Sequence, residues 1–190
     1  MPYSCVMKIL KHLPYLLLLA FLPWNAGFAQ ETRETATNRV VEMDYPASFA
    51  DLMKNFEGKV VYIDILASWC VPCIAELKES KRLESFFEEN DIVKLFLTID
   101  SRDDIHKALA IIRSEGLNGY FTSNHYPGTP KPAGTYANEI YDMFLSFKDG
   151  RADITIPRYS IINKEGKLVV RDAERPSSGE KLKKQLRKYL

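Results

Sequence analysis

The sequence predicts an α/β domain in which helices cover a central sheet of mixed parallel and antiparallel strands. Two apolar runs, residues 60–66 and 92–99, are each followed by a segment with helical spacing of its apolar side chains. This alternation is typical of parallel strands joined by crossover helices. Two further short runs within residues 159–171 flank a turn that contains Gly166, which predicts an antiparallel hairpin.

The start of the 190-residue chain has the order of a secretory signal. Lysines precede an apolar stretch that two prolines interrupt, and small residues follow it. The stretch is shorter than the roughly 20 residues that span a bilayer. We therefore expect residues 1–29 to be a signal peptide cleaved before Gln30, with an uncleaved membrane anchor as the alternative. Residues 30–39 are polar and predict a flexible tether, and residues 40–190 form the predicted domain.

Cleavage would remove two lysines and no acidic residue, which lowers the formal net charge from +1 to −1. A nearly neutral chain gives no electrostatic reason to expect nucleic acid or anionic lipid as a partner. We expect contact with a membrane only if the signal remains uncleaved.

The first half of the domain yields four elements. Residues 49–56 predict a short helix or loop before a turn at Gly58, and residues 59–66 predict a strand in the middle of the sheet. The segment after residue 73 has apolar side chains at helical spacing and charged residues on its other face. The apolar set is Ile74, Leu77, Leu83, Phe86 and Phe87, and the charged set is Glu76, Lys78, Glu79, Lys81, Arg82, Glu84, Glu88 and Glu89.

The second half continues the alternation. After the strand at 92–99 we expect a helix at 103–114 and a short strand at 117–122. Prolines and glycines then predict an irregular loop up to Gly134, and helical spacing returns at 136–147. Beyond the hairpin, with strands at 159–163 and 168–171, a basic amphipathic helix at 178–190 ends the chain.

The cysteines are the most informative residues for function. Of the three, Cys5 lies in the predicted signal, which leaves Cys70 and Cys73. A bridge across two residues closes too small a loop to restrict the unfolded chain strongly, so the pair favours redox chemistry over a structural clip. A four-ligand zinc site would need a second such pair, which the sequence lacks.

The position of the pair between a strand and a helix defines two roles. At a helix N-terminus, unpaired N–H groups and the helix dipole stabilise a thiolate, so we expect Cys70 to be the exposed nucleophile. Cys73, one turn further along, should be shielded and should resolve the mixed disulfide. Pro72 belongs in the first helical turn, where its missing N–H costs nothing.

Four features make the sequence resemble the thioredoxin superfamily, and within it the exported TlpA- and ResA-like thiol-disulfide oxidoreductases. They are the run from Trp69 to Cys73, which matches W-C-x-P-C; Glu76, three residues later; Ile156-Pro157 followed by RYSIINKEGK; and Asp64, six residues before Cys70. The resemblance implies the thioredoxin fold with an N-terminal extension, and a cycle of disulfide reduction through a mixed disulfide. The stretch at 118–150 matches this family least.

The resemblance also implies roles for residues around the cysteines. The Ile156-Pro157 bond is expected to be cis, so that the backbone of Ile156 binds an extended substrate peptide beside Trp69 and Pro72. Asp64 has apolar neighbours, and a buried carboxyl with a raised pKa could accept a proton. Glu76 is a second candidate acceptor or a tuner of thiol acidity, and the two acids would titrate as a coupled set.

The sequence is also compatible with other functions. A disulfide oxidant or isomerase of the same fold is the main alternative, and a peroxidase, a metal carrier and a partner-docking module that uses the 118–135 loop are others. His106 and His125 could join two thiolates at a metal, but we expect no metal and no cofactor. We predict a periplasmic protein with disulfide-containing protein substrates and an envelope electron donor. Apocytochrome c is one such substrate class in the resembling branch.

Overall fold

The structure is a computed structural model, and it describes residues 39–125, 134, 136–144, 146–148, 151–153 and 155–190. All of these residues lie in one compact unit, Ala36–Leu190. The predicted signal peptide and nearly all of the tether lie outside the described residues, as does most of the second half of the 118–135 loop. Within the described part, no helix is both long and apolar enough to cross a membrane.

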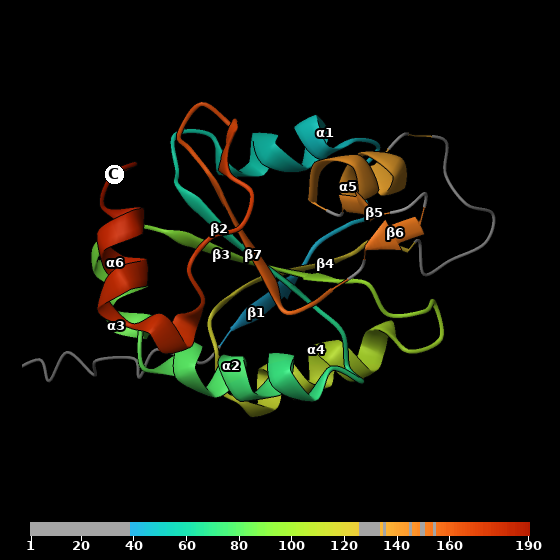
Figure 1. The fold of residues 1–190 in the computed structure, drawn as a ribbon, viewed down its shortest axis with the longest axis horizontal. Helices are drawn as coiled ribbons and strands as arrows, with labels where there is room; N and C mark the ends of the chain where they lie inside the picture. Colours follow the sequence, from blue (N-terminus) through green and yellow to red (C-terminus); the bar gives the residue numbers. More distant parts are fainter. Residues whose placement is uncertain (1–38, 126–133, 135, 145, 149–150, 154) are drawn as a thin grey trace, which may run out of the picture. The chain divides into compact units, whose positions relative to one another are not determined.

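A six-stranded sheet forms the centre of this unit, in the order β1-β4-β3-β2-β7-β8 (Figure 1). Its strands are β1 Val40–Glu42, β2 Val61–Leu66, β3 Val93–Thr98, β4 Gly119–Ser123, β7 Arg158–Ile162 and β8 Leu168–Val170. The pairs β1·β4, β4·β3 and β3·β2 are parallel, whereas β2·β7 and β7·β8 are antiparallel. The predicted mixed sheet is therefore confirmed, and β2 lies in its middle.

Helices pack on both faces of the sheet (Figure 1). They are α1 Phe49–Met53, η1 Lys54–Phe56, α2 Val71–Lys81, α3 Glu84–Glu89, α4 Ile105–Ser114, α5 Tyr136–Phe144, η2 Pro176–Ser178 and α6 Glu180–Leu186. Side chains of α1 and α5 pack with Ile63 and Ile65 of β2, whereas those of α3 and α6 pack with Tyr62 on the other face. On that second face α2 and α4 pack with Leu66. Because successive strand residues point to opposite faces, Asp64 shares the face of Tyr62 and Leu66.

Burial on both faces explains why nearly every residue of β2 is apolar. All six of its residues are buried, since helices cover the strand on both sides and β3 and β7 flank it. A central strand of this kind needs apolar side chains on both faces. The one acid in the run, Asp64, is therefore withdrawn from water as well.

The helices differ from the sequence-based prediction in their ends. The helical pattern after the cysteines divides into α2 and α3 at Leu83, the residue that precedes α3. Helix α5 ends at Phe144, and Phe147, expected in that helix, lies in β5 Ser146–Lys148, which pairs with β6 Arg151–Asp153. The last helix begins at Glu180 and ends at Leu186, so it is shorter than predicted.

Two acids that the helical pattern assigns to the solvent face are buried instead. Glu84 forms a buried ion pair with Lys94 of β3, and its Oε1 also accepts from the Asn118 N–H at 3.4 Å. Glu76 is 8% exposed because η2 lies against α2 at this point. The prediction that Glu76 and Glu84 face solvent is therefore wrong. In both cases a segment distant in sequence supplies hydrogen-bond donors, which the spacing of residues within the helix cannot reveal.

Candidate functional site

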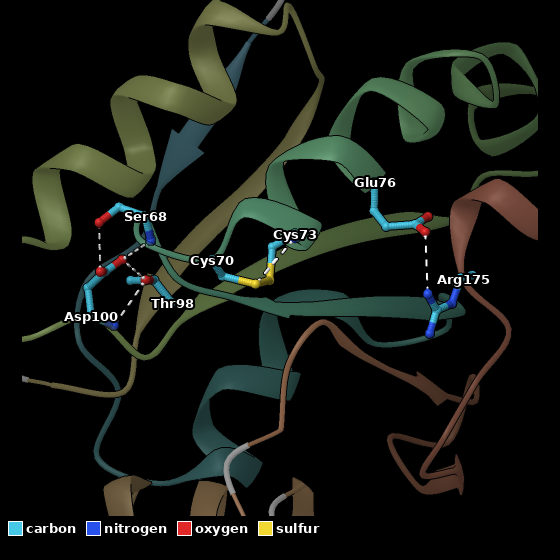
Figure 2. The surroundings of a disulfide bond; sticks show 7 residues. All are labelled: Ser68, Cys70, Cys73, Glu76, Thr98, Asp100 and Arg175. Atoms are coloured by element: carbon cyan, nitrogen blue, oxygen red, sulfur yellow. Dashed lines mark hydrogen bonds and ion pairs between the residues drawn. A yellow bond between two sulfur atoms is a disulfide. The ribbon is translucent and has the colours of Figure 1, made fainter.

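The cysteine pair lies where β2 ends and α2 begins (Figure 2). Cys70 is the N-cap residue of α2, and Cys73 lies in its first turn. The two form a disulfide with an S–S distance of 2.06 Å. The Cys73 N–H, which has no acceptor within the helix because it lies in the first turn, donates to the Cys70 Sγ at 3.2 Å. Pro72 lies in the same first turn, as expected.

Exposure differs sharply between the cysteines and their neighbours. Cys73 is 1% exposed, as predicted, but Cys70 is only 5% exposed in the disulfide form, so the expectation of an exposed nucleophile is wrong for this state. Trp69 and Val71, on either side of Cys70, are 59% and 76% exposed. Cys70, itself nearly buried, therefore stands in the chain between two large, exposed apolar side chains.

Ile156 and Pro157 come to the same site from a distant part of the chain. The Ile156-Pro157 peptide bond is cis, in agreement with the sequence-based expectation. Ile156 is partly buried and packs against the apolar cluster that contains Cys70 and Cys73. The structure thus brings together the cysteines and the loop that precedes β7.

Asp64 is 4% exposed and lies on β2 opposite Tyr159 of β7. Burial raises the pKa of its carboxyl group, the negative charge of Glu76 adds to the increase and Lys94 opposes both, so that the pKa is about 8. Its Oδ1 atom has no hydrogen-bond partner among the described residues. Because a charged carboxylate is poorly solvated there, the group holds its proton to an unusually high pH.

Glu76 is directed away from the disulfide, toward Arg175 (Figure 2). Its Oε2 accepts from the Ser177 N–H at 2.9 Å and its Oε1 accepts from the Ser177 hydroxyl at 2.7 Å. Arg175 adds an ion pair at 3.7 Å from its exposed side chain. Both carboxylate oxygens are therefore engaged by the segment just before and within η2.

Sequence reasoning missed a third acid, Asp100, on the other side of the pair (Figure 2). Asp100 is fully buried and accepts hydrogen bonds from Ser68 and Thr98. The signal that could have found it is its position two residues after the end of β3, since the carboxyl ends of neighbouring parallel strands meet at the same edge of a sheet. Strand β2 feeds the cysteines at that same edge.

Within the described ranges, no group of three His, Cys, Asp or Glu side chains could hold a metal ion. His125 is exposed, and its backbone N–H donates to the Ser123 hydroxyl at 3.0 Å. Chemically, the described residues offer a pair of sulfurs that can cycle between dithiol and disulfide, and a buried acid with a raised pKa on the strand that leads to them.

Comparison with known proteins agrees with this geometry. Residues 41–186 match the family model described as Redoxin. No curated protein matches the sequence.

Solved structures agree on the fold. A thiol-disulfide oxidoreductase of Bacteroides vulgatus is 24% identical, with 73% of this chain and 83% of that chain covered and a TM-score of 0.52. A thiol:disulfide interchange protein, DsbE, of Chlorobium tepidum is 17% identical over 72% of this chain and 84% of that one, with a TM-score of 0.51. These likenesses confirm the thioredoxin-like fold.

Proposed function

Because this chain belongs to the Redoxin family, we propose that it is an exported thiol-disulfide oxidoreductase that reduces protein disulfides with Cys70 and Cys73. The observation that supports this most is the position of Cys70 as N-cap of α2, with the Cys73 N–H donating to its sulfur. A thiolate at that position gains from the same N–H and from the helix dipole.

The proposed cycle starts from the dithiol. The Cys70 thiolate attacks one sulfur of a substrate disulfide and expels the other as a thiolate, which forms a mixed disulfide. Cys73 then loses its proton and attacks the Cys70 sulfur, which releases the second substrate thiol and leaves the Cys70–Cys73 disulfide. Two electrons pass to the substrate, and an envelope electron donor must return two to the protein.

Asp64 is the proposed acceptor of the proton that Cys73 loses. A group with a pKa of about 8 is close to an ordinary thiol in proton affinity, so transfer between them is nearly balanced. Glu76 is then the tuning residue, because its charge raises the pKa of Asp64 while Ser177 occupies both of its oxygens.

Substrate recognition in this proposal is mainly through backbone and apolar contacts. The exposed Trp69 beside Cys70 offers an aromatic surface, and Pro72 lies close by in the sequence, in the first turn of α2. The loop with Ile156 and Pro157 offers main-chain donors and acceptors to an extended peptide.

Export is proposed from the order of residues 1–29, with the tether at 30–39 between signal and domain. A periplasmic location would suit substrates such as oxidised envelope proteins or apocytochrome c, as the resemblance to TlpA- and ResA-like proteins implies. The electron donor would then lie in or at the envelope membrane.

The experiment that tests the proposal is the reduction potential of the Cys70–Cys73 pair, by equilibration against glutathione and dithiothreitol buffers. We expect a value near or below about −270 mV, that of a reductant such as thioredoxin. A Cys70→Ser variant, which cannot form the bridge, is the control. A value near about −120 mV would instead place the protein with the oxidants and contradict the direction proposed.

A further inference from the structure

The buried carboxylate of Asp100 accepts hydrogen bonds from Ser68, in the turn that precedes Cys70 (Figure 2). Asp100 Oδ2 accepts from the Ser68 N–H at 2.8 Å, and Oδ1 accepts from the Ser68 hydroxyl at 2.8 Å. The Thr98 hydroxyl donates to Oδ2 at 2.6 Å, and the Asp100 N–H donates back to Thr98 Oγ1 at 3.2 Å. Asp100 and Thr98 are both 0% exposed.

The segment that Asp100 binds is a tight turn. The Cys70 N–H donates to the Ala67 carbonyl oxygen at 3.0 Å, which closes a four-residue turn with Ser68 and Trp69 at its centre. Asp100 binds the first central residue through its backbone and its side chain. The second central residue, Trp69, is left on the outside of the turn, 59% exposed.

We propose that Asp100 is a positioning residue for thiol-disulfide exchange, which fixes this turn so that Trp69 and Cys70 face a protein substrate together. The inference rests on the proposed function and extends it to specificity. Two anchors hold Cys70: the N-cap geometry of α2 on one side and the bonds of Asp100 to Ser68 on the other. Without the second anchor, the turn can open while α2 stays in place.

The arrangement separates two kinds of substrate. A small disulfide needs only to reach the Cys70 sulfur. A protein disulfide must also dock on the apolar surface beside it, which includes Trp69 and Val71. Loss of the turn geometry should therefore slow reaction with proteins much more than reaction with small disulfides.

Substitutions at the two ends of the contact provide the test. Asp100→Ala removes both carboxylate oxygens that accept hydrogen bonds from Ser68 and Thr98. Ser68→Ala removes only the hydrogen bond from the Ser68 hydroxyl. Asp100→Asn is the rescue variant, because an amide can accept from the Ser68 and Thr98 donors and donate to the Ser68 oxygen. Ser160→Ala is the matched control, since it deletes a serine hydroxyl at a buried position outside this turn, where the hydroxyl donates to the Arg171 carbonyl oxygen at 2.7 Å.

The first measurement is hydrogen exchange of the Ser68 amide in the oxidised full-length protein. We expect exchange to accelerate about tenfold or more in Asp100→Ala, while amides of the central strand β2 keep their protection. Asp100→Asn and Ser160→Ala should exchange as the wild type does. Unchanged protection of Ser68 in Asp100→Ala would overturn the proposal.

The second measurement compares rate constants of the reduced proteins with insulin and with dithiobis(nitrobenzoate). We expect Asp100→Ala to lose about tenfold with insulin and less than about threefold with the small disulfide. Ser68→Ala should fall between it and the wild type, so the test stands even if Asp100→Ala does not fold. Equal losses with both probes, or no rescue in Asp100→Asn, would refute a positioning role. If the wild type reduces neither probe, the proposed function fails, whereas the exchange rates still decide whether Asp100 holds the turn.

Discussion

Asp64 couples the chemistry of the site to the stability of the fold. The unfolded chain exposes a carboxyl with a pKa near 3.9, whereas burial raises the pKa in the folded protein to about 8. Between these values the folded state binds a proton that the unfolded state does not. Stability that is fully present below about pH 4 is therefore lost as the pH rises toward 8.

The substitution Asp64→Asn should remove this loss. We expect the free energy of unfolding at pH 8 to increase by a few kcal/mol, because the amide needs no proton to stay neutral. The measurement is urea denaturation of the oxidised protein from pH 5 to pH 9. The wild type should lose stability across this range, and the variant should be much flatter. Equal slopes in the two proteins would show that Asp64 titrates normally.

Asp64 and Asp100 are both buried acids, but the burial of only one of them could be predicted from the sequence. Asp64 is predicted to be buried because every neighbour in its strand is apolar, and the structure agrees. Asp100 escaped notice because Ser68, which gives it two of its hydrogen bonds, follows a different strand and lies 32 residues away in the sequence. A buried acid is visible in a one-dimensional pattern only when its surroundings are local.

At the scale of elements, the contribution of the contact between α2 and η2 to the free energy of unfolding can be tested. Ser177 donates its N–H and its hydroxyl to the two oxygens of Glu76, which is nearly buried. The Arg175 ion pair adds little, since its side chain is 57% exposed. The serine therefore provides most of the polar contact between Glu76 of the cysteine-bearing helix and the C-terminal segment.

Ser177→Ala should lower the free energy of unfolding by about 1–2 kcal/mol, because a hydrogen bond to a charged acceptor is lost. Ser178→Ala is the matched control: its hydroxyl donates to the Arg175 carbonyl at 2.7 Å in an exposed position, and its loss should change stability by less than about 0.5 kcal/mol. Thermal and urea unfolding of the oxidised proteins measure both. Equal effects in the two variants would refute a specific role for the Glu76 contact.

The contact between α2 and η2 also shows which features of the helices could not be predicted from the sequence. Apolar spacing predicted helix from residue 74 onward, but it could neither place the break at Leu83 nor reveal the buried acids on the helix. Glu76 and Glu84 look like solvent-facing residues until η2 and β3 are known to pack over them. Strands β2, β3 and β7 were easier, because a run of apolar residues between turns is a local signal.

At the scale of the whole molecule, the sheet order assembles the site. The parallel pair β2·β3 sets Asp100 beside the turn to Cys70, and the antiparallel partner β7 brings the Ile156-Pro157 loop to the same cluster. Patterns in the sequence predicted the strands and the cysteine pair, and the resemblance predicted that the Ile156-Pro157 loop lies beside that pair, whereas Asp100 was not predicted. Neither could supply the hydrogen bonds that set the turn and orient Glu76, because those depend on side-chain packing across the fold.

The redox state should also alter the stability of the whole domain. A protein that acts as a reductant has a disulfide form that folding favours, whereas the reduced form of a strong oxidant is the more stable one. Closing a loop of four residues restricts the unfolded chain by only about 2 kcal/mol. If the proposed direction is right, the oxidised protein should be more stable than the dithiol by about 1–2 kcal/mol, the scale of that loop term.

Urea unfolding with and without dithiothreitol measures this difference at neutral pH. The double variant Cys70→Ser, Cys73→Ser is the control, because the reductant should leave its unfolding midpoint unchanged. A lower midpoint for the reduced wild type would mean that folding favours the disulfide, as a reductase requires. A higher midpoint for the reduced protein would mean that the dithiol form is the more stable one. The protein would then oxidise substrate thiols to disulfides instead of reducing substrate disulfides.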